Sequence, residues 1–174
     1  SSQDATAPLC DYTGGAERVI YTSGSSGTPK GVIIGDRQLD ASITALSKVV
    51  SAGHADIHLS ILPLAQLLEQ ICGIFLPIVA GAKTVFRHAA TRSLFGAPIA
   101  PLVAAFDDIR PPTSLLAPAL LGRWVAALAD RHAPDSLRFV AVGGAACAPD
   151  LINKALAAGI PVHEGYGLSE CCAV

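Results

Sequence analysis

One short segment of the sequence combines residue types that bind phosphate. Tyr21 to Gly31 reads YTSGSSGTPKG and holds three glycines, five Ser or Thr hydroxyls and one lysine. Glycines allow backbone N–H groups to point into a concavity, hydroxyls add donors, and Lys30 adds a mobile positive charge. The segment predicts a phosphate-binding loop, with a flexible Gly/Ser linker as the alternative. It is not the GxxxxGK[ST] loop, because Pro29 stands where that motif needs Gly and Gly31 where it needs Ser or Thr.

A second segment, Glu164 to Glu170, reads EGYGLSE. Glycines on both sides of Tyr166 would leave its ring open to a flat ligand such as a nucleobase. Ser169 and Glu170 offer a hydroxyl donor and a carboxylate of the kind that Mg²⁺ uses when it bridges phosphates. A simple turn is the alternative. A third segment, Gly143-Gly144-Ala145, follows an apolar run, which suits a ligand at the carboxyl edge of a parallel sheet.

The elements that must position these segments follow from the apolar pattern. Apolar runs predict strands at 18–22, 32–34, 57–62, 82–86, 113–117 and 137–142, with a last one beginning at 161. Helical spacing predicts helices at 36–53, 64–75 (closed by Pro77 and Gly81), 99–106, 118–131 and 149–158. Because the strands are continuously apolar and alternate with helices, we expect an α/β fold with a mostly parallel sheet flanked by helices. Residues 1–16 are polar and read as a leader or linker before a domain at 17–174.

Composition excludes several other classes of protein. The 174 residues are 51% hydrophobic and 15% charged with a net charge of −2, which excludes intrinsic disorder. The absence of any Lys/Arg run makes nucleic acid an unlikely partner. The most apolar stretch, 71–82, is shorter than the ~20 residues of a membrane span. Five scattered cysteines indicate reduced thiols in a cytoplasmic protein.

Taken in order, the three segments resemble those of the adenylate-forming (AMP-binding) superfamily. YTSGSSGTPKG is similar to its phosphate loop, and GYGLSE to its later aromatic-Gly-x-Thr-Glu motif. Gly143-Gly144-Ala145 is similar to its adenine-site strand end. Leu62 to Glu69 (LPLAQLLE) resembles the LPLAHxxE segment of long-chain fatty acyl-CoA synthetases. The resemblance covers 17–174 and implies an excerpt of the family's large N-terminal domain, without its C-terminal domain.

The resemblance implies ATP-dependent activation of a fatty or other apolar acid to acyl-AMP, then transfer to a thiol such as coenzyme A. It implies that the β- and γ-phosphates are held by Thr22, Ser23, Gly24, Ser25, Ser26, Gly27, Thr28 and Lys30. The adenine would be bound by Gly143, Gly144, Ala145, Glu164, Gly165, Tyr166 and Gly167. Ser169 would donate to the α-phosphate and Glu170 would ligate Mg²⁺, so Thr22, Lys30, Ser169 and Glu170 are the expected catalytic residues.

Two substitutions and the length depart from the family pattern. Gln66 stands at the usual His position, which leaves the acid preference open, and Ser169 replaces Thr while keeping the hydroxyl. We expect a truncated core to be catalytically incomplete alone and to expose apolar surface that favours self-association. Two other readings stay open: a noncatalytic nucleotide-sensing or partner-binding module, and an amino- or aryl-acid adenylation domain that serves a carrier protein.

Overall fold

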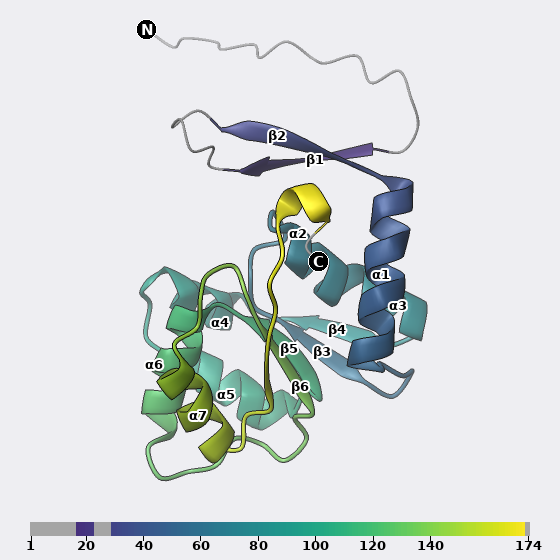
Figure 1. Cartoon of the computed structure of the whole chain (residues 1–174). Helices are drawn as coiled ribbons and strands as arrows, with labels where there is room; N and C mark the ends of the chain where they lie inside the picture. The colour runs from purple at the N-terminus through teal and green to yellow at the C-terminus, as the bar shows by residue number, and fades with distance from the viewer. Residues whose placement is uncertain (1–16, 23–28, 173–174) are drawn as a thin grey trace, which may run out of the picture.

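The computed structural model describes residues 17–22 and 29–172 of the chain (Figure 1). Its strands are β1 (Glu17–Thr22), β2 (Lys30–Gly35), β3 (Ile57–Ser60), β4 (Lys83–Phe86), β5 (Thr113–Leu116), β6 (Phe139–Val142) and β7 (Val162–Glu164). Its α-helices are α1 (Asp36–Val50), α2 (Leu67–Gln70), α3 (Leu76–Ala80), α4 (His88–Thr91), α5 (Ala100–Ile109), α6 (Pro118–Leu128) and α7 (Pro149–Ala157). A π-helical turn, η1 (Ile71–Phe75), and two 3₁₀ turns, η2 (Arg92–Phe95) and η3 (Ser169–Cys171), complete the elements.

Five strands form a parallel sheet in the order β4-β3-β5-β6-β7. Its central strand β5 is buried at all four positions, as expected for a strand covered on both faces. The predicted α/β class with a parallel sheet is therefore confirmed. Every predicted strand and every predicted helix has a counterpart, with ends that differ by a few residues.

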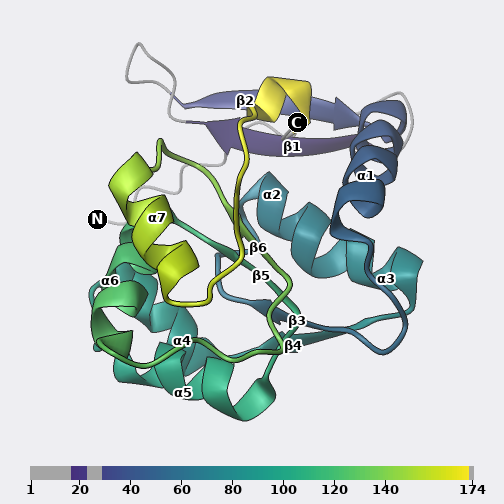
Figure 2. The same ribbon diagram turned by 60° about the horizontal axis from the view of Figure 1, so that its bottom comes forward.

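Helices cover both faces of the parallel sheet (Figure 2). On one face α5, α6 and α7 pack on Leu116, Val140 and Val142. On the other face α1, α2, η1 and α3 pack on Leu115, with Phe139 and Ala141 beside them. Neighbouring residues of β5 and β6 thus supply opposite cores, which follows from the two-residue period of a strand.

Trp124 anchors the first of these cores. It is fully buried in α6 and stacks on Phe106 with 4.0 Å between ring centroids. The stack joins α6 to α5, so this ring belongs to the core and forms no binding surface.

The hairpin β1–β2 forms a separate two-stranded antiparallel sheet next to η3 (Figures 1 and 2). Its register pairs Thr22 with Lys30 at the end of the hairpin where the connection between the two strands begins. The residues between them, 23–28, carry most of the predicted phosphate loop and lie outside the described residues. The two strands therefore hold both ends of that segment over the edge of the parallel sheet.

The sequence pattern predicts that Pro77 and Gly81 close this helix. Gly81 does end it, with φ +68°, but Pro77 lies inside the helical segment, which continues to Ala80. Proline lacks an N–H, so no helical hydrogen bond can reach the Gly73 carbonyl from Pro77. The chain adapts through the π-helical turn, in which the Leu76 N–H bonds to the Ile71 carbonyl. The hydroxyl of Thr84 donates to the freed Gly73 carbonyl at 2.6 Å. A partner on β4 thus permits a proline that the sequence pattern treats as a stop.

Within the described ranges, none of the helices has both the length and the apolar character needed to cross a bilayer.

Candidate active site

Two glycine-rich turns meet at the carboxyl ends of β6 and β7. The N–H of Gly165 donates to the Val142 carbonyl at 2.9 Å, so the chain after β7 stays against the end of β6. A Cβ added to Gly143 would be in van der Waals contact with Leu68, at 3.4 Å, and with the Gly165 carbonyl, at 3.5 Å, so the two turns lie close together here. Gly144 has φ +83°, a left-handed conformation that favours glycine. These glycines bring the two turns close together and leave the edge of the sheet open.

A cavity of about 680 Å³ lies beside this edge. Its polar lining residues include Thr22 from β1, Gln66 before α2, and Ser169 from η3. Its apolar lining residues include Leu46, Val49, Val50, Leu67, Leu68 and Cys72. The volume is in the usual range for a small-molecule site, and a mostly apolar wall with a few polar groups is typical of one.

Several predicted site residues border this one cavity, although they come from distant parts of the sequence. They are Thr22, Gly144, Glu164, Gly165, Tyr166, Gly167 and Ser169. Tyr166 is 88% exposed, so its ring is free to contact a ligand. Gly143 lies at the base of the same turn, while Ala145 follows in the exposed loop and does not border the cavity. Ser23, Gly24, Ser25, Ser26, Gly27 and Thr28 lie outside the described residues.

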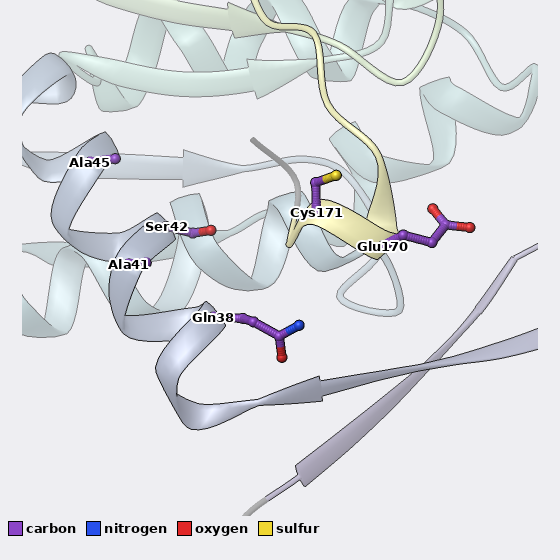
Figure 3. A pocket seen from close by; sticks show the side chains of 6 residues that line it. All are labelled: Gln38, Ala41, Ser42, Ala45, Glu170 and Cys171. Atoms are coloured by element: carbon purple, nitrogen blue, oxygen red, sulfur yellow. The ribbon is translucent and has the colours of Figure 1, made fainter.

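Lys30 and Glu170 lie on neighbouring elements, β2 and η3. Lys30 is exposed and does not border the large cavity. Glu170 borders a second, smaller cavity of about 380 Å³ against α1, with Gln38, Ala41, Ser42, Ala45 and Cys171. Figure 3 shows its carboxylate pointing away from α1. A hydrogen bond from Ser42 Oγ to the Cys172 carbonyl, at 2.8 Å, joins η3 to α1 beside this cavity.

The acidic residues fit Mg²⁺ bound mainly through a nucleotide. In the part of the chain that the structure describes, no three His, Cys, Asp or Glu side chains group as a metal cage would require. Mg²⁺ usually keeps waters and takes one or two carboxylates together with substrate phosphates. A single exposed carboxylate at Glu170, beside the hairpin that carries Lys30, matches that mode of binding.

The Glu164 side chain turns toward the loop after β6. Its Oε1 accepts a hydrogen bond from the Cys147 backbone N–H at 3.1 Å, which holds the two turns together. Burial, and secondarily this carboxylate, raises the pKa of the Cys147 thiol. Cys147 is therefore kept as a neutral thiol at neutral pH.

Two features of the site were missed or misplaced from the sequence. His163 borders the cavity and stacks on Phe139, with 4.3 Å between ring centroids. The only available signal was its place directly before the Glu164 turn. The sequence pattern also did not reveal the position of Glu69. This residue of α2 is fully buried, and its carboxylate accepts a hydrogen bond from Ser60.

Comparison with protein-family models matches residues 18–174 to the family described as AMP-binding enzyme. The sulfoacetate–CoA ligase of Cupriavidus necator is 31% identical over 178 residues, covering 99% of this chain and 33% of that protein. The long-chain-fatty-acid–CoA ligase ACSBG2 of Mus musculus is 34% identical over 74 residues, covering 40% of this chain and 11% of that protein. The chain thus spans about a third of the length of the first of these relatives and less of the second.

A solved structure has the same fold. O-succinylbenzoate coenzyme A synthetase (MenE) from Bacillus subtilis, in complex with ATP and magnesium, matches with a TM-score of 0.73 and 22% identity. The match covers 88% of this chain and 30% of that one. At this identity the likeness bears on the fold alone.

Proposed function

The chain belongs to the AMP-binding enzyme family, and from this premise we propose that the protein carrying it is an acid–thiol ligase. In its first step, a carboxylate oxygen bonds to the α-phosphorus of ATP. The bond from that phosphorus to the bridging oxygen breaks, giving acyl-AMP and pyrophosphate. In the second step, the sulfur of a thiol such as coenzyme A bonds to the acyl carbon. AMP leaves with the electron pair of the broken bond, and the thiol proton passes to water.

One observation carries this proposal: Thr22 and Ser169, which lie at opposite ends of the described chain, border the same cavity as Tyr166 and Gly144. A hydroxyl from the end of β1, a hydroxyl from η3 and an exposed aromatic ring are the groups needed along a nucleoside triphosphate. Their convergence requires the whole fold, because the hairpin, the sheet edge and the last turn each supply one of them. A flexible linker or an isolated turn would not be held in this way.

The chemistry we propose is mostly electrostatic and positional. Thr22 and Lys30, with the intervening segment 23–28, bind the β- and γ-phosphates. Tyr166 stacks on the adenine beside Gly143, Gly144 and Gly165, and Ser169 donates to the α-phosphate. Glu170 ligates Mg²⁺, which neutralises charge on the triphosphate when bound.

The apolar wall of the cavity supports an apolar acid as the substrate. Leu46, Val50, Leu67 and Leu68 offer burial to a hydrocarbon body, and each buried CH₂ contributes about 0.8 kcal/mol. Gln66 borders the cavity at the position where the long-chain segment has His. We therefore favour a fatty or other mainly apolar carboxylic acid, handled in the cytoplasm where ATP is present and thiols stay reduced.

An amino- or aryl-acid adenylation domain that serves a carrier protein is the second candidate. The name of a curated relative, the 2-succinylbenzoate–CoA ligase of Geobacillus kaustophilus, which is 28% identical over 163 residues, supports an aryl acid. A noncatalytic nucleotide-sensing or partner-binding module is a third candidate.

Two experiments separate these candidates. The 174-residue chain is heated with and without Mg·ATP. When the Mg·ATP concentration is 100 times the Kd, a chain that binds the nucleotide gains about 2.7 kcal/mol of stability. A module without a nucleotide site gains nothing. ATP–pyrophosphate exchange on the protein carrying the chain then tests activation across fatty, aryl and amino acids. If none of these acids supports exchange, only the noncatalytic module remains. If exchange occurs and the acyl group passes to a carrier protein but not to coenzyme A, the second candidate is favoured. We expect the 174-residue chain alone to bind Mg·ATP without completing the reaction.

A further inference from the structure

His163 occupies a distinctive place in the wall of the large cavity. It lies on β7 opposite Ala141 of β6, and its ring stacks on Phe139 with a centroid distance of 4.3 Å and an interplanar angle of 13°. Phe139, Ala141 and His163 all border the cavity. The stack fixes the plane of the imidazole, while the small Ala141 side chain leaves space in front of the sheet. The stack therefore restricts the rotation of the imidazole, whose two nitrogens lie on the ring edge.

The cavity that His163 borders has many apolar lining residues. They include Leu46, Val49 and Val50 of α1 and Cys72 of η1, and Lys and Arg are absent among the described residues that line the cavity. His163 is the one lining side chain among them that can carry a positive charge. The neighbouring Glu164 carboxylate is already engaged by the Cys147 N–H.

The ring nitrogens of His163 have no hydrogen-bond partner among the described residues, and the side chain is more than a third exposed. A stacked residue that only filled space could as well be Leu or Phe. An imidazole adds a directional donor that those side chains lack. A few placed polar groups among apolar side chains are the arrangement by which a pocket selects a polar group on an otherwise apolar ligand.

We propose that His163 is a specificity-determining residue that donates a hydrogen bond to an acceptor on the body of the acid substrate. The substrate class is an apolar carboxylic acid that carries a carbonyl, a hydroxyl or a second acidic group, rather than an unsubstituted fatty acid. This inference rests on the proposed acid-activating function. It adds that the acid lies along Ala141 and Phe139, with its own carboxylate toward Ser169 and its acceptor toward β7.

The test uses matched acids in ATP–pyrophosphate exchange with the protein that carries this chain. Benzoylpropionate and phenylbutyrate share a carbon skeleton and differ by one carbonyl, while suberate and octanoate share a chain length and differ by one terminal carboxylate. In one of the pairs we expect kcat/KM to be about 10-fold or more higher for the acid that carries the acceptor. The other acid of that pair leaves the His163 N–H without a hydrogen-bond partner, which raises the free energy of its complex. The pair that shows the preference tells a neutral acceptor from an anionic one.

Substitutions at His163 assign the preference to this ring. His163→Leu keeps a side chain against Phe139 but removes the donor, and should bring the ratio of kcat/KM within a pair close to one. His163→Gln keeps a donor and should retain part of the preference. His88→Leu makes the same change at an exposed histidine of α4 that does not border the cavity, and should leave the ratio unchanged.

The outcomes separate this inference from the function on which it rests. Exchange that is equal within both pairs, or a preference that survives His163→Leu, would overturn the role of His163 and leave acid activation standing. Absence of exchange with every acid would instead refute the acid-activating function itself. An unchanged thermal shift with Mg·ATP shows that each variant still folds and binds nucleotide.

Discussion

Glu69 and His58 face each other inside the core, with 3.8 Å between Glu69 Oε1 and His58 Nε2. Both side chains are buried, and Glu69 Oε1 also accepts a hydrogen bond from Ser60 Oγ. His58 Nδ1 lies 3.0 Å from Thr113 Oγ1, which extends the contacts to β5. This buried polar cluster (His58, Ser60, Glu69 and Thr113) ties the helical segment beside the cavity to two central strands. The proposed chemistry does not use it, so its role is to position α2.

Removing the carboxylate should destabilise the fold. Glu69→Ala leaves the buried Ser60 hydroxyl without its acceptor and opens a void, so we expect a loss of about 1–3 kcal/mol in the free energy of unfolding. Glu69→Gln keeps an oxygen for the Ser60 hydroxyl and should cost less. Urea titration of both variants measures the difference, with the exposed Asp108→Ala as a control near zero. A cost below about 1 kcal/mol for Glu69→Ala would contradict this role.

Gly73 should tolerate no side chain, because it packs directly against the Glu69 carboxylate. A Cβ there would lie 2.7 Å from Glu69 Oε1 in the buried cluster, so Gly73→Ala must displace a carboxylate that has no free space. We expect a destabilisation of about 1–3 kcal/mol. Gly53→Ala is the matched control, because a Cβ at Gly53 meets nothing within 4 Å. Equal denaturation midpoints for the two variants would show that Glu69 moves freely.

The elements that could be predicted from the sequence were those with a local signal. Apolar runs such as Phe139–Val142 are sufficient to identify a buried parallel strand, and the spacing of Leu121, Trp124 and Leu128 identifies α6. The short turns α4 and η2 carry no such spacing and were not predicted. The turn η2 is held by a tertiary hydrogen bond, which the Arg123 guanidinium donates to the Ser93 carbonyl.

The site residues fall into the same two groups, those with a local sequence signal and those that depend on tertiary contacts. Thr22, Tyr166 and Ser169 belong to contiguous motifs, so their residue types and order suggested them. His163 and Glu69 depend on partners far away in the sequence, Phe139 and His58 respectively, and a pattern within a few residues cannot show such contacts. Gly73 is required only because Glu69 lies beside it, which again needs the fold.

The pH dependence of stability should reveal the buried thiol of Cys72. Burial, and secondarily the Glu69 carboxylate, raises the pKa of this thiol from 9.0 to about 12. The unfolded chain therefore loses this proton at lower pH than the folded protein does. Its contribution to stability is intact below pH 9 and falls by about 1.4 kcal/mol per pH unit between 9 and 12.

The measurement compares slopes, because other groups also titrate in this range. The free energy of unfolding of the wild type and of Cys72→Ala is followed from neutral to alkaline pH. The variant starts less stable but should show a shallower decline above pH 9. At pH 8 an alkylating reagent should modify the exposed Cys171 well before Cys72. Parallel slopes for the two proteins would refute the raised pKa.

Replacing Tyr166 should separate nucleotide binding from folding. Its ring is 88% exposed, so Tyr166→Ala removes little packing and should leave the melting temperature without ligand almost unchanged. Stacking of an aromatic side chain on a base contributes about 1–3 kcal/mol, which corresponds to a 5- to 150-fold weaker Kd for Mg·ATP. Phe95→Ala is the matched control, since Phe95 is 72% exposed and does not border the cavity. Isothermal titration gives both Kd values. Equal affinities would mean that the adenine does not lie on Tyr166, and would move the nucleotide away from the carboxyl edge of β6 and β7.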